Sequence, residues 1–188
     1  TLDINLGAEI NLLKQFNIKI AVITNASLLW MDEVKEDLMK ADWVSVSIDA
    51  VEEDIWRRID RPHGALRHQE IQNGIIEFSK GYKDTLVTET MLLEGINDND
   101  ICIEKIAEQL SLIHPSKAYL LVPTRPPAES GVKRASRASL SRAVRIIRGI
   151  SGTDVECIAG DEKEEGFFFT ESIADDLLSI ASVHPVRE

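Results

Sequence analysis

The chain has 188 residues, of which 44% are hydrophobic and 28% charged, a composition typical of a soluble globular domain. Its formal net charge of −11 argues against a nucleic-acid surface over the whole chain, because phosphate binding needs clustered Lys and Arg side chains. No apolar stretch approaches the roughly 20 residues of a membrane-spanning helix and no basic leader precedes an apolar run, so we expect a cytoplasmic protein. The two cysteines, Cys102 and Cys157, fit neither a metal-ligand spacing nor a disulfide framework and favour ordinary thiols in a reducing compartment.

Helical and strand patterns alternate along the first part of the chain. Apolar side chains recur with helical spacing over residues 6–16, 31–38, 52–60, 69–80, 101–113 and 136–150, the last helix being capped by Ser136 or Ser139. Short apolar or alternating runs predict strands over residues 18–23, 44–50, 85–93 and 117–122. Strands that alternate with helices predict parallel βαβ units with right-handed crossovers, and hence an α/β fold.

The pattern changes after Gly149. Residues 154–159 and 166–170 predict a pair of strands around an acidic turn, and residues 173–181 predict a short helix. We therefore divide the chain into a main domain, residues 1–150, and a small α+β appendage, residues 151–188. Neither end carries a starting or closing signal, so we expect a fragment of a longer protein.

The strand over residues 44–50 carries an unusual row of polar side chains. Because side chains alternate along a strand, Val44, Val46 and Ile48 share one face. The other face holds Ser45, Ser47 and Asp49. Such a row predicts the lining of a barrel interior or cleft, where Asp49 could accept hydrogen bonds from ligand hydroxyls. The alternative role for Asp49 is to cap the helix that begins near residue 52.

Polar or charged side chains also mark the ends of the other predicted strands, which is where parallel α/β folds bind ligands. They are Thr24, Asn25 and Ser27 after the first strand, Glu89, Thr90, Asn97 and Asp98 in and after the third, and Thr124 and Arg125 after the fourth. Each group alone also reads as an ordinary turn, a helix cap or a surface position. Their coincidence at one edge of the sheet favours a binding site, in which Arg125 could hold a carboxylate or phosphate.

Two segments are locally basic in this acidic chain. Residues 130–153 contain six Lys or Arg side chains and no acidic one, and Arg142, Arg145 and Arg148 form a stripe on the predicted helix. The stripe predicts a contact with RNA phosphates or an acidic partner, and its alternative is a solvated outer helix face. Residues 57–68 form the second basic segment. No Gly-rich phosphate loop, Ser-His-Asp order or zinc spacing is present.

These strand ends resemble the core of radical S-adenosylmethionine (SAM) enzymes. The segments that carry the resemblance are residues 20–27 (IAVITNAS), 44–49 (VSVSID), 55–63 (IWRRIDRPH), 89–98 (ETMLLEGIND) and 125–129 (RPPAE). More narrowly, the chain resembles archaeal and bacterial iron–sulfur oxidoreductases related to the wyosine-type tRNA-modifying enzymes. The resemblance covers about residues 1–150, extends to the appendage, and rests on the order and spacing of these segments.

The resemblance implies a partial (βα)6 TIM-type barrel that binds SAM and a [4Fe–4S] cluster. The cluster would cleave SAM reductively to a 5′-deoxyadenosyl radical, which abstracts hydrogen from a substrate. The implied cofactor-binding residues are Thr24, Asn25, Ser47, Asp49, Ile96, Asn97, Val122 and Pro123. Among them, Ser47 and Asp49 would contact the ribose. The resemblance places Glu89 on the substrate side, with Arg125 as a further substrate-side residue, and puts Ala26 where relatives often have Gly.

The chain departs from this family at two motifs. It contains neither the Cys-x3-Cys-x2-Cys cluster motif nor the Gly-Gly-Glu-Pro stretch that holds the SAM amino group. A cluster needs three thiolates, which Cys102 and Cys157 cannot supply. We therefore expect the cluster ligands and the first strands of the barrel upstream of Thr1. The isolated chain should then be inactive, bind SAM weakly, and expose an open sheet edge that favours self-association.

Two other function classes remain open at this point. One is a non-catalytic interaction module that needs a partner chain. The other is an unrelated TIM-barrel aldolase or lyase, although no strand-end lysine or phosphate loop is evident. The substrate does not follow from the sequence.

Overall fold

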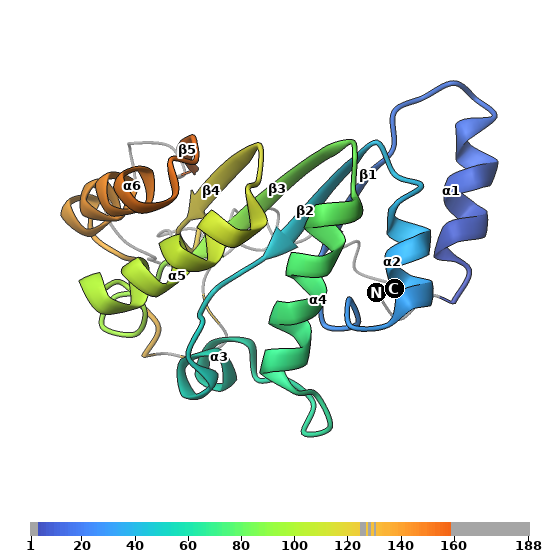
Figure 1. The fold of residues 1–188 in the computed structure, drawn as a ribbon. Coiled ribbons are helices and arrows are strands. Elements are labelled where there is room, and N and C mark those ends of the chain that lie inside the picture. Colours follow the sequence, from blue (N-terminus) through green and yellow to red (C-terminus); the bar gives the residue numbers. More distant parts are fainter. Residues whose placement is uncertain (1–3, 125–126, 128, 130, 159–188) are drawn as a thin grey trace, which may run out of the picture.

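The computed structural model describes residues 4–124, 127, 129 and 131–158. Its centre is a five-stranded sheet in the order β1-β2-β3-β4-β5, in which every neighbouring pair is parallel. The strands are β1 (Ala21–Thr24), β2 (Trp43–Ser47), β3 (Thr85–Met91), β4 (Lys117–Leu121) and β5 (Val155–Ile158). The helices are α1 (Leu6–Lys14), α2 (Asp32–Leu38), α3 (Glu53–Asp60), α4 (His68–Gly81), α5 (Asp100–Ile113) and α6 (Arg137–Ser151) (Figure 1). The expected α/β fold on a parallel sheet is confirmed.

The ends of several helices follow from identifiable local signals. After α1 ends at Lys14, the chain turns at Asn17, which has a positive φ of 54°, a conformation that Asn tolerates better than most residues. The side chain of Asn99 accepts a hydrogen bond from the amide of Cys102 and so caps α5. Of the two serines considered as caps for α6, Ser136 takes the role, because its hydroxyl accepts from the amide of Ser139.

The strand expected at the start of the appendage belongs to the main sheet. β5 pairs with β4 in parallel, so that Ala118 lies opposite Val155 and Leu121 opposite Ile158. The sheet therefore continues past residue 150. The domain boundary placed there stays a prediction, and its other expected elements, residues 166–170 and 173–181, lie outside the described residues.

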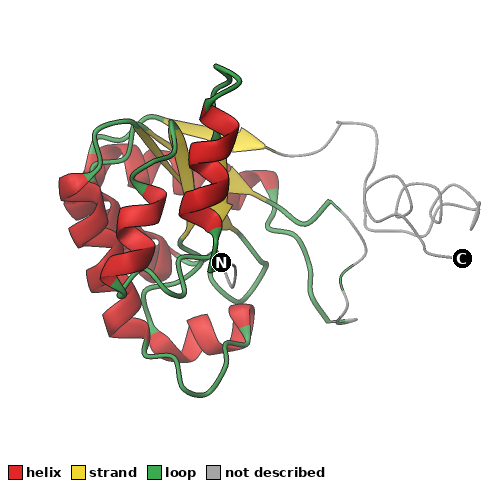
Figure 2. Ribbon diagram, turned by 90° about the vertical axis from the view of Figure 1, so that its right-hand side faces the viewer, coloured by secondary structure: helices red, strands yellow, loops and turns green. Residues whose placement is uncertain are grey.

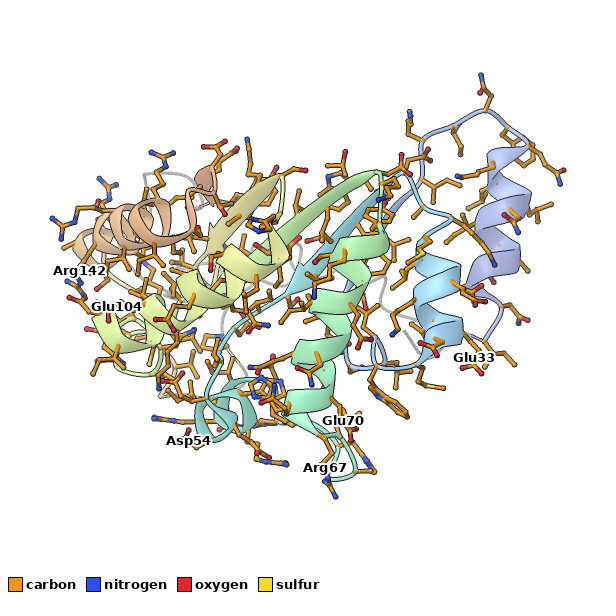
Figure 3. The ribbon with its side chains drawn as sticks, viewed as in Figure 1. Glu33, Asp54, Arg67, Glu70, Glu104 and Arg142 are labelled. Atoms are coloured by element: carbon orange, nitrogen blue, oxygen red, sulfur yellow. The ribbon has the colours of Figure 1, made fainter. Side chains whose placement is uncertain are left out.

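One face of the sheet forms the core with the helices. Val44 and Val46 of β2 are fully buried in a hydrophobic cluster that includes Phe78 of α4 and Leu110 of α5. Figure 2 views the sheet nearly edge-on, with most of the helices on one side of it. Charged side chains such as Glu33, Glu70 and Glu104 point outward from α2, α4 and α5 (Figure 3), so these helices are amphipathic.

Candidate functional site

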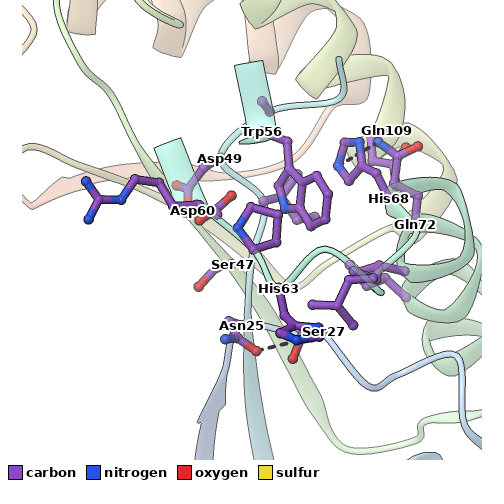
Figure 4. Close-up of a pocket in the computed structure, with 17 residues that line it drawn as sticks. Asn25, Ser27, Ser47, Asp49, Trp56, Asp60, His63, His68, Gln72 and Gln109 are labelled. Carbon is purple, nitrogen blue, oxygen red and sulfur yellow. Dashed lines mark hydrogen bonds between the residues drawn. The ribbon is translucent and has the colours of Figure 1, made fainter. Parts of the chain in front are cut away.

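A cavity of about 290 Å³ opens at the carboxyl ends of β1 and β2 and extends between these strands and the helical layer (Figure 4). Its polar lining comes from the loops after β1 and β2 and from the end of α3. Its far wall comes from α4 and α5. The polar side chains that line it are Asn25, Ser27, Ser47, Asp49, Asp60, Arg61, His63, His68, Gln72 and Gln109. The cavity therefore lies where a parallel α/β sheet is expected to bind its ligand.

The turn after β1 is held by its own polar side chains. The hydroxyl of Thr24 accepts from the amide of Ala26 at 3.1 Å, and the side chain of Asn25 accepts from the amide of Ser27 at 3.1 Å. Ala26 is buried and has a positive φ of 59°, which explains why a glycine suits this position. Thr24 is buried, so Asn25 and Ser27 are the members of this turn that line the cavity.

The loop after β2 places the two outermost members of its polar row. Ser47 and Asp49 both line the cavity. An oxygen of Asp49 accepts a hydrogen bond from the amide of Met91 at 2.6 Å, which joins this loop to the end of β3. The alternative role of Asp49 as a helix cap is wrong, because Glu52 occupies the N-cap position of α3 and no side chain caps it.

Asp49 faces a second carboxyl group across the cavity mouth. The carboxyls of Asp49 and Asp60 lie within hydrogen-bonding range of each other (Figure 4). Burial, and then the negative charge of Asp60, raise the pKa of Asp49 to about 7, against the opposing effect of the Met91 amide. Partial burial of its carboxyl also raises the pKa of Asp60, although the residue as a whole lies at the surface.

The far wall of the cavity is a buried polar group on α4. The ring of His68 stacks on Trp56 with centroids 4.5 Å apart and bonds to the backbone of Ala50. The amide nitrogen of Gln72 donates to the carbonyl of Val51 at 3.0 Å and lies 3.3 Å from the His68 ring. Burial lowers the pKa of His68, which favours the neutral ring. These side chains hold the backbone that follows Asp49.

Asn97 was expected near the cofactor, and its side chain is fully buried. Its nitrogen donates to the carbonyls of Asp49 and Met91, both at 2.8 Å, and its oxygen accepts from the amide of Leu93 at 2.8 Å. The side chain therefore joins the ends of β2 and β3. Only its backbone is left for the ligand contact that the family resemblance implies.

Glu89 lies on the sheet face opposite the main helical core. The hydroxyl of Ser45 donates to its carboxylate at 2.6 Å, so the innermost member of the β2 polar row has a partner within the sheet. Glu89 lies beside Ser47 on β2 and Tyr119 on β4 in the strand register. It does not line the cavity, and its substrate-side role stays a prediction.

The described members of the remaining expected site residues do not line the cavity. The side chain of Val122 is in the core, and Ile96 and Pro123 are half-buried at the ends of β3 and β4. Their predicted cofactor contacts remain untested. Arg125 lies outside the described residues, and Thr124 is exposed.

The basic stripe on α6 is partly engaged within the chain. Arg142 pairs with Asp100 and donates to the carbonyl of Asp98. Arg148 donates to Asp154 and to the carbonyl of Val155. Arg145 is exposed. Two of the three guanidinium groups, those of Arg142 and Arg148, therefore already form bonds within the chain. Contact of this stripe with RNA stays a prediction.

The described residues do not supply a metal centre. No group of three or more His, Cys, Asp or Glu side chains in this part of the chain is arranged to hold a metal ion. Cys102 is buried in α5 and Cys157 is exposed on β5, and both are free. A [4Fe–4S] cluster therefore does not fit these residues.

The described helices are too short or too polar to cross a membrane.

Asp60 and Gln109 are among the polar residues of the cavity that the sequence did not single out. Asp60 ends an amphipathic helix, and Gln109 occupies an ordinary helical position, so neither carried a local signal. The segment IWRRIDRPH did include Asp60, but only as part of a family resemblance. Their convergence with Asp49 depends on how α3 and α5 pack beside β2.

Comparison with other sequences gives several UPF0026 proteins and one protein named as a GTPase. No protein-family model matches this chain. It is 42% identical over all of its 188 residues to a UPF0026 protein of Methanocaldococcus jannaschii. It is also 29% identical over 150 residues to a protein named GTPase Obg of Brachyspira hyodysenteriae. The chain spans 59% of the length of the first relative and 22% of the second.

Comparison with solved structures identifies the fold. A domain of pyruvate-formate lyase-activating enzyme from Bacteroides vulgatus matches 82% of this chain and 92% of its own, with a TM-score of 0.65 and 18% identity. A radical SAM methyltransferase from Sphaerobacter thermophilus matches 76% of this chain and 42% of its own, with a TM-score of 0.58 and 19% identity. The structure of TYW1 with a lysine-pyruvate adduct bound matches 79% of this chain and 46% of its own, with a TM-score of 0.61 and 18% identity. At these identities the likeness shows that the chain has the partial-barrel α/β fold of radical SAM enzymes.

Proposed function

We propose that this chain is the SAM-binding part of a radical SAM oxidoreductase. The observation that carries the proposal is the cavity at the ends of β1 and β2, in a fold shared with radical SAM enzymes. The whole protein would cleave SAM reductively and abstract hydrogen from a substrate that remains to be identified. The narrower relation to wyosine-type tRNA-modifying enzymes, which the segment resemblance implies, is part of the same proposal.

The cavity suits the polar end of a nucleoside ligand. Asn25, Ser47 and Asp49 offer amide, hydroxyl and carboxylate groups at one side of it. The nitrogen of Gln109 at the other side is buried and lacks a hydrogen-bond partner among the described residues. A volume of about 290 Å³ is at the lower end of the range of small-molecule sites. SAM would therefore place part of its structure here, with Ser47 and Asp49 accepting from its ribose hydroxyls.

The cluster would be held by residues outside this chain. Three thiolates are needed for the proposed cluster, and the sequence has two cysteines on separate elements. By this proposal the 188 residues alone are inactive. We expect the sequence preceding Thr1 in the gene to encode Cys-x3-Cys-x2-Cys and then Gly-Gly-Glu-Pro. The full-length protein, purified without oxygen, should be brown and should cleave SAM in the presence of dithionite.

The cofactor site is tested by two conservative substitutions in the full-length protein. Ser47→Ala and Asp49→Asn should each weaken binding of S-adenosylhomocysteine, by about fivefold and about tenfold, because each removes a hydrogen bond to the ligand. Asp49→Asn keeps an oxygen that can accept from Met91. Isothermal titration calorimetry gives the affinity, and thermal unfolding shows whether the fold is kept. Ser79→Ala, on α4 away from the cavity, serves as the control. Unchanged affinity in both variants would contradict the proposed site.

A further inference from the structure

The inner end of the cavity is enclosed by helices rather than by strand ends. It is the part that α4 and α5 line, together with one side chain of α3 (Figure 4). The side chains that form it are Trp56, His68, Ile71, Gln72, Ile75 and Gln109. The cofactor residues that the family resemblance implies follow a different path, along the strand ends from Asn25 after β1 to Pro123 after β4. A cofactor on that path does not fill the inner end.

The described wall of the inner end carries no charged side chain. Burial lowers the pKa of His68 and so favours its neutral ring. That ring bonds to the backbone of Ala50, and its Nε2 atom lies 3.3 Å from the amide nitrogen of Gln72. The same nitrogen of Gln72 donates to the carbonyl of Val51. An ion in the inner end would lose its hydration without gaining a counterion, so the wall favours an uncharged occupant.

Gln109 is a polar residue of this wall whose hydrogen bonding is incomplete. It lies on α5, is 7% exposed and lines the cavity. Its side-chain nitrogen has no hydrogen-bond partner among the described residues. A buried donor without an acceptor is unfavourable. The terminal torsion of a glutamine side chain is soft, so the amide can turn its nitrogen toward an acceptor in the cavity.

The rest of the inner end is apolar. Trp56, Ile71 and Ile75 are buried members of the hydrophobic core. The ring of His68 stacks on Trp56 with an angle of 8° between the planes, so the two rings form one flat part of the wall. The whole cavity measures about 290 Å³, and an apolar cavity of roughly 150 Å³ is large enough to bind benzene. The cavity therefore has room for a ring-sized group beside the polar contacts at its mouth.

We propose that the inner end of the cavity is a second binding site, for an uncharged, ring-sized small molecule with a hydrogen-bond acceptor that Gln109 contacts. The apolar walls would remove the ring from water, and the Gln109 amide would bond to the acceptor. The molecule is distinct from the proposed cofactor and lies beside it in the same cavity. The inference goes beyond the proposed function, because it uses none of the residues assigned to the cofactor.

The test uses acetophenone and α-methylstyrene, two molecules of nearly the same shape. Acetophenone carries a carbonyl oxygen where α-methylstyrene has a methylene group, so only acetophenone can accept a hydrogen bond from Gln109. Binding to the full-length protein is followed by NMR of isotope-labelled glutamine side chains, and the Gln109 signal is assigned from its loss in Gln109→Met. Acetophenone should shift this signal and bind about fivefold to tenfold more tightly than α-methylstyrene. This comparison in the wild type depends on no variant.

A substitution of Gln109 tests the hydrogen bond itself. Gln109→Met keeps the length of the side chain and removes its polar atoms. It should weaken acetophenone binding about fivefold to tenfold and leave α-methylstyrene binding unchanged, with the Gln72 side-chain signal as the readout. Gln69→Met makes the same change at an exposed position on α4 and should leave both affinities unchanged.

Three outcomes would overturn the inference. Equal affinities of the two probes in the wild type would mean that the inner end is purely apolar. Tighter binding of benzoate than of acetophenone would mean that it takes an anion. Lack of binding by every probe would mean that the inner end holds solvent only.

A competition experiment separates the inference from the proposed function. Saturating S-adenosylhomocysteine should leave the affinity for acetophenone unchanged. Loss of acetophenone binding in its presence would assign the inner end to the cofactor, which overturns the second site while the proposed function stands. Binding of acetophenone without any binding of S-adenosylhomocysteine would contradict the proposed function alone.

Discussion

The Asn97 side chain is bonded on every side to the backbone that frames the cavity. Its three hydrogen bonds reach the carbonyls of Asp49 and Met91 and the amide of Leu93, and it has no exposed surface. A buried polar group that loses its partner costs about 1–3 kcal/mol. The position of Asp49 therefore depends on a residue that does not line the cavity.

We predict that Asn97→Leu lowers the free energy of unfolding by about 3 kcal/mol, because it leaves two carbonyls and one amide buried without partners. Urea unfolding monitored by circular dichroism measures the change. The matched control is Asn73→Leu on the exposed side of α4, which should change stability by less than about 0.5 kcal/mol. Equal effects of the two substitutions would show that the Asn97 bonds contribute little.

Single residues were predictable from sequence where the local pattern carries the information. The alternation in β2 placed Ser47 and Asp49 on a common face, and both line the cavity. The same pattern could not show that Ser45 bonds to Glu89, because that contact depends on the register between β2 and β3. The place of Asp60 in the cavity could not be predicted either, since it depends on where the end of α3 lies relative to β2.

Helix α4 packs against the loop that carries the cavity residues after β1. A Cβ atom added to Gly74 would lie 2.4 Å from the carbonyl oxygen of Leu29 and 2.7 Å from the amide nitrogen of Trp30. Backbone atoms cannot move aside as a flexible side chain can. The glycine therefore permits α4 to pack directly on the loop that continues from Ala26.

We predict that Gly74→Ala lowers the free energy of unfolding by about 2 kcal/mol, although alanine favours a helix by about 1 kcal/mol. Gly149→Ala, on α6, provides the opposite case, because a Cβ atom at this position would meet no atom within 4 Å. It should raise stability by about 0.5–1 kcal/mol. Thermal unfolding of both variants compares them directly. Stabilisation by Gly74→Ala would mean that α4 and the loop can separate without cost.

The order of helices and strands through β4 was predictable because apolar periodicity marks each one, and a capping side chain also marks the start of α5. The fifth strand was recognised but assigned to an appendage. Residues 154–157 alternate acidic and apolar residues, a pattern that also suits a strand of a separate hairpin. Its parallel pairing with β4 depends on the path of α6, which returns the chain to the sheet edge. Local sequence does not encode that path.

Taken as a whole, the described molecule is a sheet with two open edges. β1 pairs only with β2, and β5 only with β4, within the described residues. An unpaired strand presents backbone donors and acceptors that another copy could use. The exposed apolar side chains near β1 include Ile18 and Ile23, at 53% and 69% exposure, so the backbone edge coincides with apolar surface there.

We predict that the 188-residue chain self-associates through β1 and that Ile23→Lys reduces this association. A lysine on an edge strand opposes pairing with another strand, since its charge would be buried in the contact. The substitution moves the net charge from −11 toward zero, so weaker association could not come from greater overall repulsion. Ile101→Lys, at a 64% exposed position on α5, makes the same change in charge away from the sheet and should leave association unchanged. Sedimentation velocity over a range of concentrations measures the effect. A chain that stays monomeric throughout, or equal association of both variants, would contradict a role for the β1 edge.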